Sequence, residues 1–172
     1  REGAVAGGPA DEICTARKGM PQDVRIAPDG KRFYVADMQA DGVHVVDGET
    51  FKEVGFVAAG QGTHGLYPSR DGKYLYITNR GTHRIHGKRG GAGSVTVMEF
   101  ATGKVVSTWT IPDGGSPDMG NVSADGKWLW LAGRRIWLAP WRLWRSGPRS
   151  RSRPRDRCGS GRRLLRWIWR LL

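Results

Sequence analysis

The chain has 172 residues and a formal net charge of +12 at neutral pH. Residues 1–133 contain 15 Lys or Arg and 15 Asp or Glu, whereas residues 134–172 contain 13 Arg and a single acid, Asp156, so the whole net charge lies in this tail. The basic isoelectric point therefore does not identify the body of the protein as a nucleic-acid-binding protein. Cys14 and Cys158 are too few and too far apart for a disulfide framework or a zinc motif, and no run of about 18 apolar residues predicts a membrane-spanning helix.

A turn-and-strand pattern occurs three times in residues 18–133. Each copy places an Asp-Gly pair between two apolar runs rich in β-branched and aromatic residues, at Asp29-Gly30, Asp71-Gly72 and Asp125-Gly126. Such a pair is a strong signal for a β-hairpin because both residues readily adopt positive φ. An acid that recurs beside Gly in every copy serves turn geometry, so we assign these acids a structural rather than a catalytic role.

The repeat predicts ten strands, at roughly 22–27, 31–37, 42–47, 52–58, 63–69, 73–79, 94–100, 104–111, 118–123 and 127–132. Several of them are apolar on both sides, as expected of strands that are covered on both faces. Four antiparallel strands per repeat of about 42 residues are typical of a β-propeller blade, whereas a β-sandwich would not explain the repeated sequence. We predict an all-β fold: an incomplete β-propeller of about two and a half four-stranded blades, followed by an irregular basic tail.

The tetrapeptides Tyr34-Val35-Ala36-Asp37 and Tyr76-Ile77-Thr78-Asn79 each follow an Asp-Gly-Lys or Asp-Gly-Lys-Arg turn by a few residues. In this context they resemble the YVTN-repeat (YncE-like) β-propeller family of bacteria over about residues 18–133. The resemblance implies a WD40-like ring of about seven blades that acts as a non-enzymatic binding or interaction scaffold in the periplasm or outside the cell. The chain departs from the family after Gly133, where the expected Gly-x-Val-x-Val-x-Asp strand does not follow.

The two ends of the chain lie outside this pattern. We expect residues 1–17 to be the end of a preceding blade or disordered. Residues 134–172 use almost exclusively Arg, Trp, Leu, Pro, Ser and Gly, a bias that a shifted reading frame in GC-rich DNA would give, and we expect this tail to be out of frame or disordered. We expect residues 139–161 to be irregular, with at most a short helix near 162–171. The alternative is a genuine cationic arm that binds anionic membranes or nucleic acid.

Three polar residues occupy one repeated position, at the start of the innermost strand of each blade: Gln22, His64 and Asp118. The innermost strands of a propeller line its central channel, so side chains at one repeated position converge on the axis. We predict that these three residues form a ligand-binding surface at the channel mouth. The alternative is that they hydrogen-bond the backbone of the adjacent turn.

The inserted loop 80–93 carries His83 and His86, which are weak candidates for a transition-metal site because neither has a carboxylate or Cys partner in the sequence. Its Gly-rich segment 88–93 offers backbone N–H groups to an anion, although a solvated hairpin tip is the favoured interpretation. No nucleophile-elbow, phosphate-loop or metalloprotease motif occurs, so we predict no catalytic residue, metal or cofactor. A propeller fragment with cofactor- or metal-dependent activity stays open as an alternative. The exposed blade edges predict self-association.

Overall fold

The computed structural model describes residues 19–84, 91–111, 114–134 and 136–142. The predictions for residues 1–17, for His86 and for a helix near 162–171 lie outside these ranges. In the part of the chain that the structure covers, no helix is long and apolar enough to cross a membrane.

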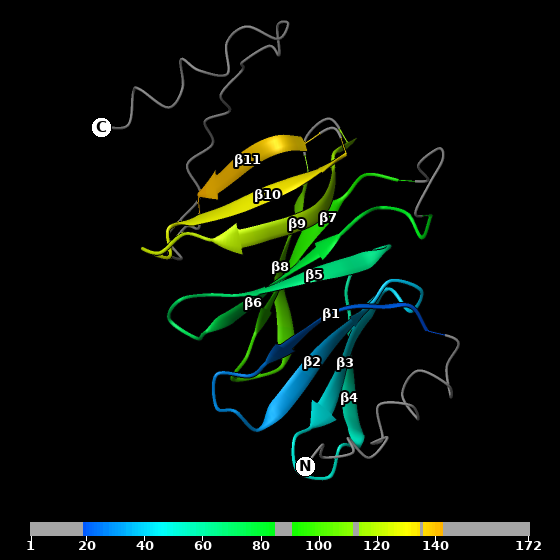
Figure 1. The fold of residues 1–172 in the computed structure, drawn as a ribbon, viewed down its shortest axis with the longest axis vertical. Helices are drawn as coiled ribbons and strands as arrows, with labels where there is room; N and C mark the ends of the chain where they lie inside the picture. The colour runs from blue at the N-terminus through cyan, green and yellow to red at the C-terminus, as the bar shows by residue number, and fades with distance from the viewer. Residues whose placement is uncertain (1–18, 85–90, 112–113, 135, 143–172) are drawn as a thin grey trace, which may run out of the picture.

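The described residues form three antiparallel sheets, each with its strands in chain order. Blade 1 contains four strands, β1 (Pro21–Ile26), β2 (Arg32–Asp37), β3 (Gly42–Asp47) and β4 (Glu53–Ala58). Blade 2 contains β5 (Thr63–Pro68), β6 (Tyr74–Asn79), β7 (Ser94–Glu99) and β8 (Lys104–Thr110). Blade 3 contains β9 (Ser116–Val122), β10 (Trp128–Arg134) and β11 (Ile136–Arg142). Figure 1 shows the three sheets following one another from blue to orange, with β1, β5 and β9 as neighbours.

The third blade has one strand more than the sequence pattern indicated. We expected two strands here and irregular chain over residues 139–161, but β11 pairs with β10 in an antiparallel ladder from Gly133↔Ile136 to Trp128↔Arg142, with a register shift between Leu131 and Gly133. For residues 139–142 the expectation was wrong because it followed the change in composition at residue 134, whereas a ladder needs only backbone donors and acceptors in register. Residues 143–161 lie outside the described ranges. Pro140 lies within β11, and the edge position of this strand accommodates a residue that has no N–H to donate.

The Asp-Gly turns differ in type from the prediction. Only the glycines adopt positive φ, at 71° for Gly30, 68° for Gly72 and 70° for Gly126, so the turns are not the hairpin type in which both residues do. Gly30 N donates to Ala27 O (2.9 Å), which closes an ordinary turn before the left-handed glycine. The Asp29 carboxylate accepts the Lys31 amide (3.0 Å), and this side-chain bond favours the tighter right-handed conformation at the acid.

Two apolar clusters hold the blades together. Between blades 1 and 2 the cluster is made of side chains from both sheets, including Val43, Leu66 and Ile77, all fully buried. Between blades 2 and 3 it includes Val95 and Leu129. Blade 2 therefore buries one face against blade 1 and the other against blade 3, and the two interfaces provide most of the apolar burial available to these sheets.

The blade interfaces also carry specific polar contacts. Asp23 of β1 accepts the Leu66 amide of β5 through Oδ2 (2.9 Å). Arg70, in the turn after β5, donates to the carbonyls of Val122 (2.5 Å) and Ser123 (3.1 Å) in blade 3. Each contact joins the inner region of one blade to the next, so these bonds fix the order in which the blades stack.

The outer face of blade 1 lacks a neighbour among the described residues. Val24 and Ile26 on β1 and Val54 and Phe56 on β4 are between 42% and 57% exposed. Exposed apolar side chains that alternate with half-buried residues along both edge strands are typical of a face that packs on another sheet.

Candidate functional site

The inner strands β1, β5 and β9 share an irregularity at the predicted site residues. The pairing register slips between Pro21 and Asp23 in β1 and between Thr63 and Leu66 in β5. In β9 it slips opposite the step from Ala132 to Gly133, where Asp118 has no partner. A β-bulge inserts an extra residue, bends the strand and redirects a side chain, and bulges are frequent beside functional sites. The three blades thus repeat one backbone distortion at Gln22, His64 and Asp118.

The structure brings two of the three predicted side chains together. Asp118 faces His64 across the interface between blades 2 and 3, and both its charge and its backbone act to raise the pKa of the imidazole. Gln22 does not join them through any contact of its side chain. Its Nε2 donates to the carbonyls of Met20 (3.2 Å) and Pro21 (3.1 Å), so it bonds the chain immediately before it.

A buried arginine that the sequence analysis overlooked completes the cluster. Arg80 follows β6, its side chain is 6% exposed, and its Nε lies 2.6 Å from Asp118 Oδ1. The approach is off the N–H axis, so the contact is an ion pair rather than a well-directed hydrogen bond. Arg80 Nη1 also contacts Met38 Sδ of blade 1 (3.5 Å). Met38 and Arg80 occupy equivalent positions relative to the Asp-Gly turns of their blades. A cation at this position in blade 2, where blade 1 has an apolar residue, was the sequence signal that could have identified Arg80.

The backbone of Arg80 adds to the same junction. Its N–H donates to Gly62 O (2.9 Å), and its carbonyl accepts from the Ser116 hydroxyl (2.9 Å). Side chain and backbone together link this one residue to blades 1, 2 and 3. We refer to His64, Arg80 and Asp118 as the channel-wall cluster.

Burial determines the electrostatics of the channel-wall cluster. Burial lowers the pKa of His64, and the Arg80 cation lowers it further. The Asp118 carboxylate acts to raise it, but the resulting pKa lies below the ordinary value for histidine. The imidazole is therefore neutral at neutral pH. Its Nδ1 is shielded from solvent and has no hydrogen-bond partner within the described ranges. The cluster thus offers a neutral imidazole next to a carboxylate that Arg80 already balances.

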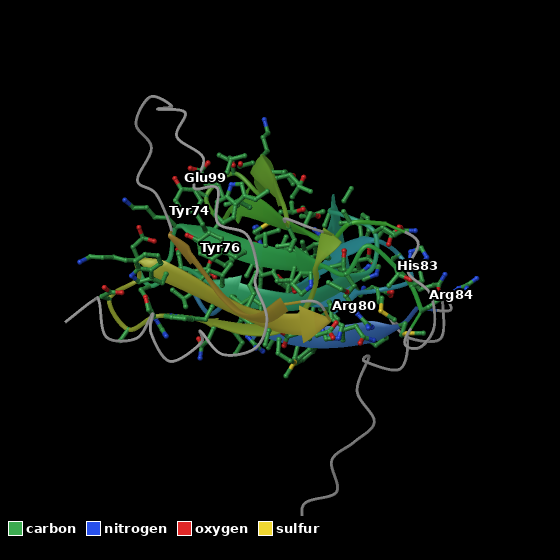
Figure 2. The ribbon with its side chains drawn as sticks, turned by 90° about the horizontal axis from the view of Figure 1, so that it is seen from above. Tyr74, Tyr76, Arg80, His83, Arg84 and Glu99 are labelled. Atoms are coloured by element: carbon green, nitrogen blue, oxygen red, sulfur yellow. The ribbon has the colours of Figure 1, made fainter. Side chains whose placement is uncertain are left out.

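Of the two metal candidates in the inserted loop, the structure describes His83, which pairs with a carboxylate. His83 Nε2 lies 2.7 Å from Asp41 Oδ1, and Asp41 also accepts the Gly62 amide (2.6 Å). Asp41 adopts positive φ (57°), which is uncommon for a residue with a side chain, and its carboxylate ties the β2–β3 turn of blade 1 to blade 2. Among the described residues no group of three or more metal-ligating side chains occurs. Figure 2 shows Arg80, His83 and Arg84 at one end of the sheets, with Tyr74, Tyr76 and Glu99 at the other.

Buried polar pairs elsewhere in the blades have a structural role. In blade 1, His44 Nε2 lies 3.6 Å from Asp37 Oδ2. In blade 2 the corresponding pair is Thr96 and Asn79, joined by a hydrogen bond of 2.9 Å. Burial acts to raise the pKa of Asp37, but the amides of Met20, Ala40 and Gln39 that it accepts outweigh burial and lower it. A pair that recurs with different chemistry in successive blades holds the sheet together and does not define a reaction.

Comparison with known proteins identifies the fold. No protein-family model matches the chain, and no curated protein matches it. Among solved structures, hydrazine synthase of Kuenenia stuttgartiensis is similar with a TM-score of 0.52 and 24% identity over 66% of this chain and 29% of that one. A protein of Bacteroides fragilis provisionally assigned as a 6-phosphogluconolactonase has a TM-score of 0.58 and 21% identity over 73% and 38%. The β-propeller domain of Myceliophteria thermophila Cps50 (Swd1) has a TM-score of 0.53 and 16% identity over 81% and 42%.

These similarities define the class of protein: the described part of the chain is an all-β, partial β-propeller, as predicted. The chain spans between 29% and 42% of the length of the similar structures. At these identities the likeness concerns the fold alone. The position of β1, β5 and β9 as neighbouring inner strands makes them one wall of the propeller channel.

Proposed function

We propose that this chain is part of a YVTN-like β-propeller that binds a ligand, without catalysing a reaction, at the channel wall around His64 and Asp118. The observation that carries the proposal is the bulge repeated in β1, β5 and β9 at one position. A distortion that recurs in three successive blades at the strands lining the axis directs side chains towards a common space. A periplasmic or extracellular location is part of this proposal and rests on the family resemblance.

The chemistry of the channel-wall cluster favours binding over catalysis. A general base needs a proton-bearing partner within hydrogen-bond reach, and nucleophilic catalysis needs a hydroxyl or thiol beside the base. In the described ranges no hydroxyl or thiol is hydrogen-bonded to His64, and the Asp118 charge is balanced by Arg80. A neutral imidazole has one donor and one acceptor nitrogen, which suits directional recognition of a ligand group.

A lactonase assay tests the catalytic alternative directly, because two similar structures are provisionally assigned as 6-phosphogluconolactonases. The chain is incubated with 6-phosphogluconolactone beside its His64→Gln variant. We expect the hydrolysis rate of both to equal the uncatalysed rate. Hydrolysis above that rate that His64→Gln abolishes would overturn the non-enzymatic proposal.

A binding selection tests the scaffold itself. A library of displayed random peptides is selected against the full chain and then measured against His64→Gln, with Gln39→Ala as an exposed control. We expect the selected peptides to bind the chain and the control equally and to lose at least about tenfold in affinity for His64→Gln. Peptides that bind all three proteins alike would place recognition elsewhere and contradict the proposed site.

A further inference from the structure

A second site lies at the other ends of the inner strands. A cavity of about 370 Å³ is bounded by Arg25 of β1, Tyr67 and Arg70 at the end of β5 and its turn, and Gly120 and Asn121 of β9. It therefore touches all three blades. Tyr74 N donates to Ser69 Oγ (2.9 Å) in the same turn, and Figure 2 shows Tyr74 at the end of the sheets away from Arg80, so this cavity is separate from the channel-wall cluster.

Arg70 gives the cavity an unbalanced positive charge. Its Nε and Nη2 donate to the neutral carbonyls of Ser123 and Val122, which fix the guanidinium in place. These two bonds use two of the five guanidinium N–H groups and leave three for a ligand. Arg70 makes no ion pair with any residue that the structure describes. By contrast, Arg25 is neutralised by Asp23 at 2.5 Å.

The remaining lining groups complement the guanidinium. Asn121 Oδ1 accepts the Val122 amide (2.9 Å), which leaves the Asn121 NH₂ group as a donor. Ser69 is engaged by its own turn, donating to Asp71 Oδ1 (2.7 Å) and accepting two amides. Burial raises the pKa of Tyr67 to about 12, so Tyr67 stays neutral and contributes an uncharged aromatic wall.

We infer that this cavity binds a small oxyanion, a phosphate or carboxylate group, through Arg70 and Asn121. A planar guanidinium held by backbone carbonyls is preorganised for two-point contact with such an anion. The cavity volume is at the lower end of the range for small-molecule sites, about 300–1,000 Å³. The inference is independent of the proposed function, because it uses residues at the other end of the channel wall.

Asn121→Asp is the sharpest test, because it places a negative charge in the cavity while the new carboxylate still accepts the Val122 amide. Asn121 is exposed, so the change leaves the core intact. Gln39→Glu is the matched control, since it adds the same charge at an exposed position outside the cavity. The full chain is used throughout, so the tail with its 13 Arg contributes the same background binding to each protein.

Equilibrium dialysis measures the binding of inorganic phosphate and, separately, of malonate, at constant ionic strength. We expect Asn121→Asp to weaken the saturable component by about tenfold or more, and Gln39→Glu to change it by less than about twofold. Arg70→Lys keeps the charge but loses the fork, and we expect an intermediate loss. Binding of both anions by Asn121→Asp as tight as by Gln39→Glu, or no saturable binding of either anion by the unchanged chain, would overturn the inference. Preference for phosphate or malonate then identifies which group the site selects.

Discussion

The ion pair between Arg80 and Asp118 predicts an asymmetric response to mutation. The Arg80 side chain is 6% exposed, whereas that of Asp118 is 28% exposed. Replacing Asp118 by Asn leaves a guanidinium that cannot reach water, and loss of one partner from a buried pair costs about 3–5 kcal/mol. Replacing Arg80 by Met, the residue that blade 1 carries at the equivalent position, leaves a carboxylate that solvent can still reach. We expect Arg80→Met to cost about 1–2 kcal/mol, as for the loss of one charge-assisted contact.

The double variant completes the thermodynamic cycle. With both charges removed, no buried ion is left unpaired, so the double variant should be more stable than Asp118→Asn alone. The free energy of unfolding is measured by urea titration at neutral pH, followed by tryptophan fluorescence and checked by circular dichroism. The backbone bonds of Arg80 to Gly62 and Ser116 persist in every variant, so the cycle reports on the side chains. Equal costs for the two single variants, or a double variant at the sum of both, would refute the reasoning.

Three further results are expected. Gly133→Ala should destabilise blade 3 by more than about 2 kcal/mol in the same urea titration, because the added Cβ would overlap a backbone carbonyl of β9. Gly30→Ala should lower the free energy of unfolding by only about 1–2 kcal/mol, because the added Cβ meets no neighbour and the cost is that of positive φ alone. Burial is the main cause that lowers the pKa of His64, so the unfolded chain binds a proton more readily than the folded one. The free energy of unfolding should therefore fall as the pH drops below about 6.5 towards the lowered pKa, and His64→Gln should remove this decrease. Val24→Lys combined with Ile26→Lys should reduce self-association in sedimentation velocity, since both side chains are more than half exposed on the face of blade 1 that no described residue covers. An unchanged sedimentation profile would exclude this face as the site of self-association.

The sequence was sufficient for the blades because each carries its own local signals. Asp-Gly turns fall between apolar strands at a regular spacing, and every strand of blades 1 and 2 lies within a residue or two of its predicted bounds. Strand β11 was missed because it has no alternation of polar and apolar residues to mark it, and its place depends on pairing with β10. The turn type was missed because Asp-Gly is compatible with more than one hairpin geometry, and the Asp carboxylate decides between them.

The channel-wall cluster was only partly predictable. Alignment of the repeats identified His64 and Asp118, since equivalent positions on inner strands must face the same axis. The side chain of Gln22, the third residue that the alignment indicated, bonds the backbone immediately before it and does not contact the other two. Arg80 follows β6 and does not lie on an inner strand, and it reaches Asp118 only because blades 2 and 3 stack. Contacts that depend on how one blade sits against the next have no signature in a single repeat.

The stacking of blades 1 and 2 is tested most directly by hydrogen exchange at the Leu66 amide. Because β5 is the inner edge of its sheet, this N–H has no strand partner on that side and is protected only by Asp23 Oδ2 of blade 1, at 2.9 Å. Exchange is followed by NMR in the full chain and in Asp23→Ala. The propeller arrangement predicts slow exchange at Leu66 that becomes fast in Asp23→Ala, while the Ile77 amide within blade 2 stays protected. Fast exchange at Leu66 in the unchanged chain, with Ile77 protected, would show folded sheets that do not stack and would contradict the account.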